Sequence, residues 1–279
     1  MEATGYFRPV PEKTAEEVRT FLKERTADEY NVIDVRQPGE YEKGHIPGAT
    51  LIPLGELPSR LAELDPSKPT IAYCRSGARS RSAAQVLLEA GFTDAVSMQG
   101  GMLAWEGVAA AGPPEAGMAF FSRTTRPEDL ISLAYALEDG TGRFYEGLLA
   151  SVTEEQAHEL FSTLVAAEAH HKKTLVDLAA RLQPLEKRVA VEASLISDSL
   201  GRDIMEGGVP VMKALSWAKG KPVRDILEFG MSLEVNAYDL YIKMQNRSPD
   251  EEARHVFKVI AEEEKRHLDR LASLLDKGL

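Results

Sequence analysis

The sequence predicts two domains, an α/β domain with a parallel sheet followed by an all-α four-helix bundle. The chain has 279 residues, which is more than one ordinary domain needs. Over residues 1–112, short apolar runs alternate with helical patterns, which is typical of a mostly parallel sheet covered on both faces. A stretch rich in Gly and Pro follows at 111–117, and beyond it the pattern is almost purely helical.

Three apolar runs predict the strands of the first domain, at 31–35, 70–73 and, more weakly, 95–98. A helical pattern at 15–24 precedes the first run, and another at 81–90 separates the last two. Because glycine readily adopts the left-handed conformation that ends helices, Gly91 is predicted to stop the second helix.

Four long periodic segments predict the helices of the second domain, at 127–150, 153–182, 222–246 and 249–276. Sequences typical of capping boxes, at 153–156 and 248–251, indicate where two of these helices begin. About 40 residues separate the second helix from the third, too many for a tight turn, so we expect a crossover with short helices of its own. The predicted boundaries are therefore 1–112, a linker at 113–122, and 123–279.

The composition excludes several classes of function. The net charge is -11, from 33 Lys and Arg against 44 Asp and Glu, and no basic run could follow a phosphate backbone. Nucleic acid is therefore not an expected partner. No 18 apolar residues run together and the first ten residues form no apolar leader, so a membrane is not an expected partner either. A single cysteine cannot form an internal disulfide, which favours a reducing, cytoplasmic setting.

The lone cysteine, Cys74, follows a predicted strand directly and precedes a predicted helix. Consecutive N–H groups in such a loop can form a nest that binds anions, and Arg75 and Arg79 add positive charge. Each of these effects favours the thiolate that a nucleophilic cysteine requires. A lone cysteine is more often an inert core residue. A core position is not followed by Arg-Ser-Gly-Ala-Arg-Ser, however, so we predict a nucleophile.

The first domain resembles the rhodanese family over residues 1–112. Four motifs occur in the family's order: Asp34-Val35-Arg36 with Glu40, Gly-His-Ile-Pro-Gly-Ala at 44–49, Cys-Arg-Ser-Gly-Ala-Arg at 74–79, and Gly100-Gly101 with Trp105. The resemblance implies a sulfurtransferase in which Cys74 takes sulfane sulfur from a thiosulfate-like donor and passes it to a thiol or other acceptor.

The resemblance also implies roles for the residues around Cys74. The anionic donor would be bound by the loop residues Arg75, Ser76, Gly77, Ala78 and Arg79. Six residues from Cys74 to Arg79 is the length that the family associates with sulfur rather than with phosphate or arsenate. Four further polar residues are expected to hold the loop scaffold rather than to react: Asp34, Arg36, Glu40 and His45.

A second set of polar residues repeats in the helical half. Glu168 and His171 are three residues apart, and therefore on one helix face, and Glu264 and His267 repeat this spacing. Thirty residues before each pair lies another acid, followed seven residues later by a tyrosine. The offset between the two sets is always 96, from 138 to 234, 145 to 241, 168 to 264 and 171 to 267. This pattern predicts two helix pairs related by an internal repeat.

Six of these residues are predicted metal ligands: Glu138, Glu168, His171, Glu234, Glu264 and His267. Solvated helix charges are the alternative, but Glu168 and Glu264 fall near the middle of long helices on apolar faces. Four carboxylates inside a bundle are costly unless cations pair with them, and this ligand set is the dimetal arrangement known for ferritin-like bundles. Three other histidines are predicted to be surface or packing residues: His158, His170 and His255.

The second domain resembles the ferritin-like superfamily over 123–279, and rubrerythrin-like members in particular. The resemblance implies two metal ions per chain, reaction with peroxide or dioxygen, and a homodimer, and the mixed N and O ligands favour iron first and manganese second. Rubrerythrins usually carry a rubredoxin domain with paired cysteines, which this chain lacks, so an external electron donor is expected. They also commonly carry a further Glu one turn after the third-helix ligand, where this chain has Ala237.

Two alternatives for the bundle remain open in the sequence. It could store or oxidise iron beside the sulfurtransferase. It could instead be a metal-responsive regulatory or dimerisation module that controls the rhodanese-like domain.

Overall fold

The computed structural model describes residues 10–112, 127–150, 152–182, 195–196, 203–248 and 250–276. The chain divides into two compact units, Met1–Pro114 and Glu115–Leu279. The predicted linker, 113–122, lies outside the described residues, so its boundaries stay predictions.

The first unit is built on a five-stranded sheet in which every strand pair is parallel, in the order β1-β5-β4-β2-β3. The strands are β1 (Glu12–Lys13), β2 (Asn31–Asp34), β3 (Thr50–Leu51), β4 (Thr70–Tyr73) and β5 (Ala95–Met98). The three predicted strands are confirmed as β2, β4 and β5. The edge strands β1 and β3 have two residues each, too few to produce an apolar run that sequence reasoning could detect.

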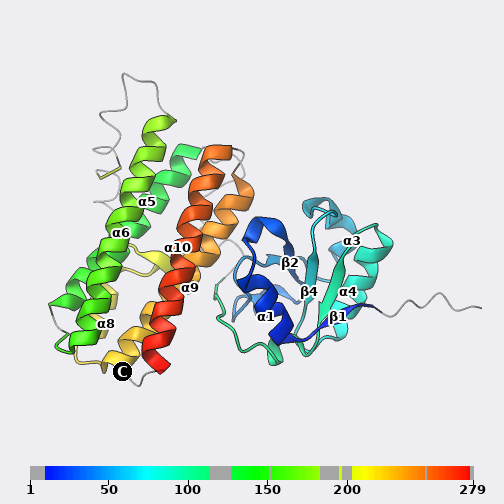
Figure 1. Ribbon diagram of the computed structural model, residues 1–279, viewed down its shortest axis with the longest axis horizontal. Helices are drawn as coiled ribbons and strands as arrows, with labels where there is room; N and C mark the ends of the chain where they lie inside the picture. The colour runs from blue at the N-terminus through cyan, green and yellow to red at the C-terminus, as the bar shows by residue number, and fades with distance from the viewer. Residues whose placement is uncertain are drawn as a thin grey trace, which may run out of the picture. The chain divides into compact units, whose positions relative to one another are not determined.

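Helices cover both faces of this sheet, as Figure 1 shows for α1 (Ala15–Lys23) on one side and α3 (Leu57–Arg60) and α4 (Ala78–Glu89) on the other. Side chains alternate along a strand, so Val32 and Ile71 pack with α1, whereas Ile33 and Ala72 pack with α4. A fourth helix, α2, spans Pro38–Tyr41.

Helix α4 begins at Ala78, three residues before the predicted start at 81. Gly77, with a φ of 99°, occupies the N-cap position, and its carbonyl accepts a hydrogen bond from the N–H of Arg81 at 3.1 Å. Glycine tolerates this left-handed conformation without strain, which lets the helix start directly after the turn.

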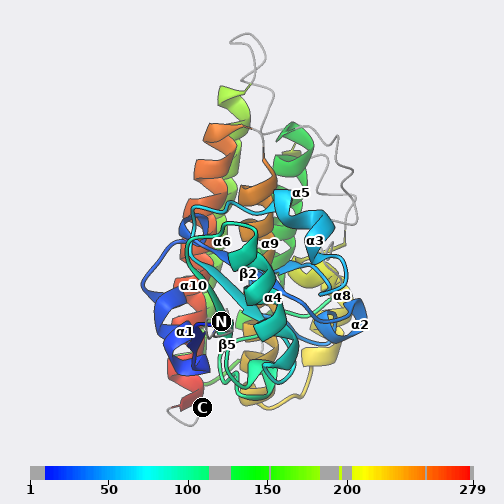
Figure 2. The same ribbon diagram turned by 90° about the vertical axis from the view of Figure 1, so that its right-hand side faces the viewer.

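The four long helices of the second unit are confirmed. They are α5 (Pro127–Leu149), α6 (Glu155–Arg181), α9 (Val223–Arg247) and α10 (Glu251–Asp276). Figures 1 and 2 show them lying side by side along a common direction, with α5 packed on α6 and α9 packed on α10. The predicted crossover contains short helices, η5 (Glu206–Gly208) and α8 (Val211–Ala218).

The helix starts differ from the predicted capping boxes. Glu154, not Thr153, is the N-cap of α6, and its side chain forms no capping hydrogen bond. At α10 the carboxylate of Asp250, rather than the hydroxyl of Ser248, accepts the N–H of Ala253 at 2.8 Å. None of the helices in the described part of the chain is both long enough and apolar enough to cross a membrane.

Candidate functional sites

Cys74 lies directly after β4, at the N-terminal end of α4, and its side chain is buried. Its Sγ accepts a hydrogen bond from the N–H of Gly77 at 3.1 Å. Burial raises the pKa of Cys74, but the N–H groups of Ser80, Ser76 and Gly77 outweigh burial, so the pKa is lowered from its ordinary value. The loop therefore stabilises the thiolate through its backbone.

The first two carbonyl groups of this loop, those of Cys74 and Arg75, accept hydrogen bonds from the segment that follows β5. The N–H groups of Met102 and Leu103 donate to the carbonyls of Cys74 and Arg75 at 2.8 and 3.1 Å. This approach requires Gly101, because a Cβ at that position would lie 2.2 Å from the carbonyl oxygen of Cys74. With the carbonyls bound in this way, the N–H groups of the loop are left to face the sulfur.

The structure brings Arg79 close to Cys74, but it also gives Arg79 a partner. Both terminal nitrogens of Arg79 donate to the carboxylate of Glu40 at 2.8 Å. This bond lowers the pKa of Glu40 to about 2. The same bond raises the pKa of Arg79, and the charge of Cys74 raises it further. Arg75 and Ser76 are exposed on the loop, whereas Arg81 is exposed on α4 and lies 3.5 Å from Glu12.

The four polar residues expected to support the Cys74 loop all contact other residues of the first unit. Arg36 is buried and donates to both oxygens of Asp34 and to the carbonyl of Gly44. The ring of His45 stacks on that of Tyr41, with the centroids 3.6 Å apart.

Sequence reasoning missed two buried serines beside Cys74. The hydroxyl of Ser80 lies 3.7 Å from the sulfur of Cys74 and 2.8 Å from the hydroxyl of Ser97. A serine six residues after the cysteine carries no pattern that distinguishes it from an exposed helix serine, so sequence reasoning could not identify it.

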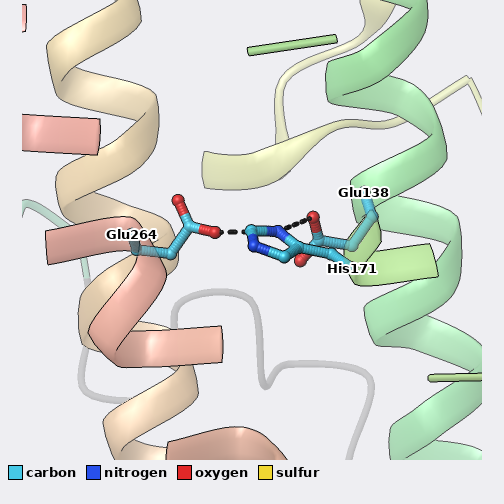
Figure 3. Close-up of side chains that lie close together, drawn as sticks. All are labelled: Glu138, His171 and Glu264. Atoms are coloured by element: carbon cyan, nitrogen blue, oxygen red, sulfur yellow. Dashed lines mark hydrogen bonds and ion pairs between the residues drawn. The ribbon is translucent and has the colours of Figure 1, made fainter. Parts of the chain in front are cut away.

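In the second unit, all six predicted metal ligands are buried. Figure 3 shows His171 between two carboxylates, with Nδ1 3.0 Å from Glu138 Oε2 and 3.1 Å from Glu264 Oε1. His267 repeats the arrangement, with Nδ1 3.3 Å from an oxygen of Glu234 and 3.3 Å from an oxygen of Glu264. The structure thus brings together residues from four different helices.

The two tyrosines of the repeat connect its halves. The hydroxyl of Tyr145 donates to Glu234, and the hydroxyl of Tyr241 donates to Glu138. Each tyrosine lies two helical turns from the acid of its own helix and bonds to the acid of the other half. The internal repeat seen in the sequence is therefore expressed as a pair of crossed hydrogen bonds.

Burial and mutual repulsion dominate the electrostatics of the cluster. Burial raises the pKa of Glu168 and of Glu206 well above the ordinary range, with the charge of Glu138 adding to both, and it raises the pKa of Glu234 to about 8. Burial alone would lower the pKa of His267, but the neighbouring carboxylates raise it to about 10. The pKa of Glu264 is lowered despite burial, because Glu234 and the two histidines bond to it.

The ligand set fits bound cations. Among the described residues, both oxygens of Glu168 and both oxygens of Glu206 lack a hydrogen-bond partner. An unpaired buried carboxylate is unfavourable, and a coordinated cation removes that penalty. The candidate ligand atoms form three groups within 4.8 Å: Glu138, His171 and Glu264; Glu234, Glu264 and His267; and Glu168, Glu206 and Glu234.

Two acids of this centre were not predicted. Glu206 comes from η5 in the crossover, and only its two following glycines distinguish it in the sequence. Glu263 lies 2.7 Å from Nε2 of His171, but its counterpart 96 residues earlier is Ala167, so the repeat does not identify it. The three excluded histidines are exposed, which confirms the prediction made for His158, His170 and His255.

The chain thus combines a parallel α/β unit, in which a buried cysteine lies in a loop between a strand and a helix, with a helical bundle that contains buried Glu and His clusters. The family model of the rhodanese-like domain matches residues 14–107, and the rubrerythrin model matches 205–275. The chain belongs to the rhodanese family, and its second unit carries a rubrerythrin domain.

Similar proteins cover the first unit. A sulfurtransferase from Allochromatium vinosum is 37% identical over 86 residues, which are 30% of this chain and 80% of the relative. The thiosulfate sulfurtransferase GlpE from Pseudoalteromonas translucida is 39% identical over 75 residues, 27% of this chain and 71% of the relative. A crystal structure of a rhodanese-like domain protein from Staphylococcus aureus is 32% identical, covers 36% of this chain and 93% of its own, and has a TM-score of 0.33.

Proposed function

We propose that the protein is a sulfurtransferase that carries sulfane sulfur as a persulfide on Cys74, and that its bundle holds a dimetal centre reacting with peroxide or dioxygen. The observation that supports the first part is the ring of N–H groups that lowers the pKa of Cys74. The observation that supports the second part is the set of buried carboxylates without hydrogen-bond partners.

In the first step, the thiolate of Cys74 attacks the outer sulfur of a thiosulfate-like donor. The new S–S bond forms as the donor's S–S bond breaks, and sulfite leaves with the electron pair. In the second step, an acceptor thiolate attacks the outer sulfur of the persulfide, and the Cys74 thiolate leaves. The low pKa of Cys74 makes it both an available nucleophile and a good leaving group at neutral pH.

The loop residues bind the anionic donor in this proposal. The N–H groups that face the sulfur of Cys74 also stabilise the negative charge of the persulfide. Arg75 on the exposed side and Arg79 beside Cys74 attract the sulfonate group of the donor. Glu40 fixes the position of Arg79 through two hydrogen bonds.

In the bundle, the six ligands predicted from the repeat hold two metal ions, iron in preference to manganese. When bound, such a pair supplies the redox chemistry that reduces peroxide or dioxygen, and an external donor must return the electrons. Tyr145 and Tyr241 orient the two acids to which they donate, Glu234 and Glu138. All four of these side chains are fully buried.

Two measurements on the full chain test this proposal. Replacing Cys74 with Ser should reduce sulfur transfer from thiosulfate to the background rate, because the only thiol is lost. Replacing Glu168 or Glu264 with Ala should sharply lower metal content by elemental analysis, whereas His158→Ala and His255→Ala should leave it unchanged. Metal loss in the histidine variants but not in the glutamate variants would refute the ligand assignment.

A further inference from the structure

We propose that Glu206 is a seventh ligand of the metal centre, a fifth carboxylate supplied by the crossover instead of a long helix, and that it makes the two metal positions unequal. This inference rests on the proposed dimetal function of the bundle.

The side chain of Glu206 has no other partner that would explain its burial. It is 0% exposed, and neither of its oxygens forms a hydrogen bond with any described residue. A ligand atom of Glu206 lies within 4.8 Å of ligand atoms of Glu168 and Glu234, both of which are candidate ligands from the repeat. A buried, unpaired carboxylate that points into a cluster of carboxylates is unfavourable unless a cation binds there.

The backbone around Glu206 is shaped to place it at the centre. Gly207 and Gly208 adopt φ values of 70° and 72°, which only glycine accepts easily. They close a tight turn in which the N–H of Met205 donates to the carbonyl of Val209 at 2.9 Å. The side chain of Met205 is buried in the core of the bundle and fastens the turn there.

This turn packs against helix α5 at two neighbouring residues, Gly140 and Thr141. The hydroxyl of Thr141 donates to the carbonyl of Leu137 at 3.1 Å and accepts the N–H of Glu206 at 3.3 Å. Gly140 leaves the necessary space, because a Cβ there would lie 1.9 Å from the carbonyl oxygen of Ile204. Glycine disfavours the interior of a helix, so its presence at position 140 is explained by this close approach.

Glu206 breaks the symmetry of the repeat. It groups with Glu168 and Glu234 and is absent from both groups that contain a histidine. Glu234 also belongs to the group with His267, whereas no residue of the Glu206 group other than Glu168 comes from the helix of His171, so we assign Glu206 to the metal position on the Glu234 side. The residue 96 positions earlier is Ala110, in the first unit, so the other half has no equivalent acid. One metal position therefore gains an anionic oxygen ligand that the other lacks, and we expect the two positions to fill in sequence.

A titration of the metal-free full chain with Co²⁺ alone tests this inference, with binding followed by visible absorption and elemental analysis. The wild-type chain should bind two ions with different affinities. Glu206→Gln should lower the affinity of one position by at least about tenfold and change its absorption, while the other position is unaffected. The matched control is Glu146→Gln, an exposed acid on α5, which should bind as the wild type does.

A second variant tests whether the position of the Glu206 carboxylate matters when the carboxylate itself is retained. Gly140→Ala keeps Glu206 but displaces the turn, so it should weaken the same metal position, whereas Gly230→Ala, where a Cβ meets only ordinary contacts, should not. Unchanged affinities and absorption in Glu206→Gln would overturn the inference, and so would equal weakening of both positions. Failure of the wild-type chain to bind Co²⁺ would instead refute the dimetal function itself.

Discussion

At the residue scale, the chemistry of Cys74 depends on backbone groups more than on arginine side chains. The groups that most lower its pKa are the N–H groups of the loop and the hydroxyl of Ser80. The sequence predicted the thiolate from a nest of backbone N–H groups, with Arg75 and Arg79 adding positive charge. The backbone contribution is the larger one in the structure, because Arg79 is hydrogen-bonded to Glu40 and Arg75 is exposed.

The pH dependence of thiol reactivity follows from this pKa shift. Because the pKa of Cys74 is lowered, its thiolate should persist at lower pH than that of a free thiol. The rate of alkylation by iodoacetamide should rise with pH and level off after an inflection below the ~8.5 of an ordinary cysteine. Since the chain has one cysteine, the signal is unambiguous, and an inflection at or above that value would contradict the prediction.

The two arginines of the first turns of α4 should differ in effect. Arg79→Ala should raise the KM for thiosulfate by roughly tenfold, because it removes a charge beside Cys74 and leaves Glu40 unpaired. Arg81→Ala is the matched control, since Arg81 is exposed and faces Glu12, and its KM should change little. Equal effects in steady-state kinetics would argue against donor binding by Arg79.

At the scale of elements, periodicity determined what the sequence could predict. The four long helices carry regular apolar spacing and the three central strands are mostly apolar runs, and all were predicted. The two-residue strands β1 and β3 and the four-residue helices α2 and α3 show neither a run nor a period in the sequence. The start of α6 was misjudged because Thr, Glu and Gln near a helix start do not reveal which of them is the cap.

The same reasoning explains the candidate metal site. Six ligands could be predicted because their spacing repeats at a constant offset in two helix pairs. Glu206 belongs to no such repeat, because a turn and the space left by Gly140 determine its position. The missing acid at Ala237 was visible in the sequence, but only the fold could place a carboxylate from a distant segment beside Glu234.

The contact between η3 (Gly101–Leu103) and the Cys74 loop gives a test at this scale. Gly101→Ala would place a Cβ 2.2 Å from the carbonyl oxygen of Cys74, so the loop must shift. We expect sulfur transfer to fall by at least tenfold and the first unit to lose about 2 kcal/mol of stability by urea unfolding. Gly55→Ala, at an exposed position with open space, is the control, and activity lost equally in both variants would contradict this account.

At the scale of the whole molecule, the two units have separate hydrophobic cores, so we expect a substitution in one unit to leave the site of the other intact. Cys74→Ser should leave metal content at the wild-type value, because no residue of the cluster belongs to the first unit. Conversely, Glu264→Ala should leave sulfur transfer from thiosulfate unchanged. Assaying both properties in both variants tests this independence, and loss of metal in Cys74→Ser would show that the units are coupled.

The crossed tyrosine bonds make each half of the bundle depend on the other. Because the hydroxyls of Tyr145 and Tyr241 each donate to the acid of the opposite half, one helix pair by itself would leave its tyrosine without this acceptor. Two copies of that pair, related by a twofold axis, would restore the hydrogen bond. The bundle therefore contains, within one chain, the contacts that two copies of one helix pair would make across a twofold axis. Glu206 and Glu263 have no acidic counterparts 96 residues earlier, so at these two positions the halves are not interchangeable.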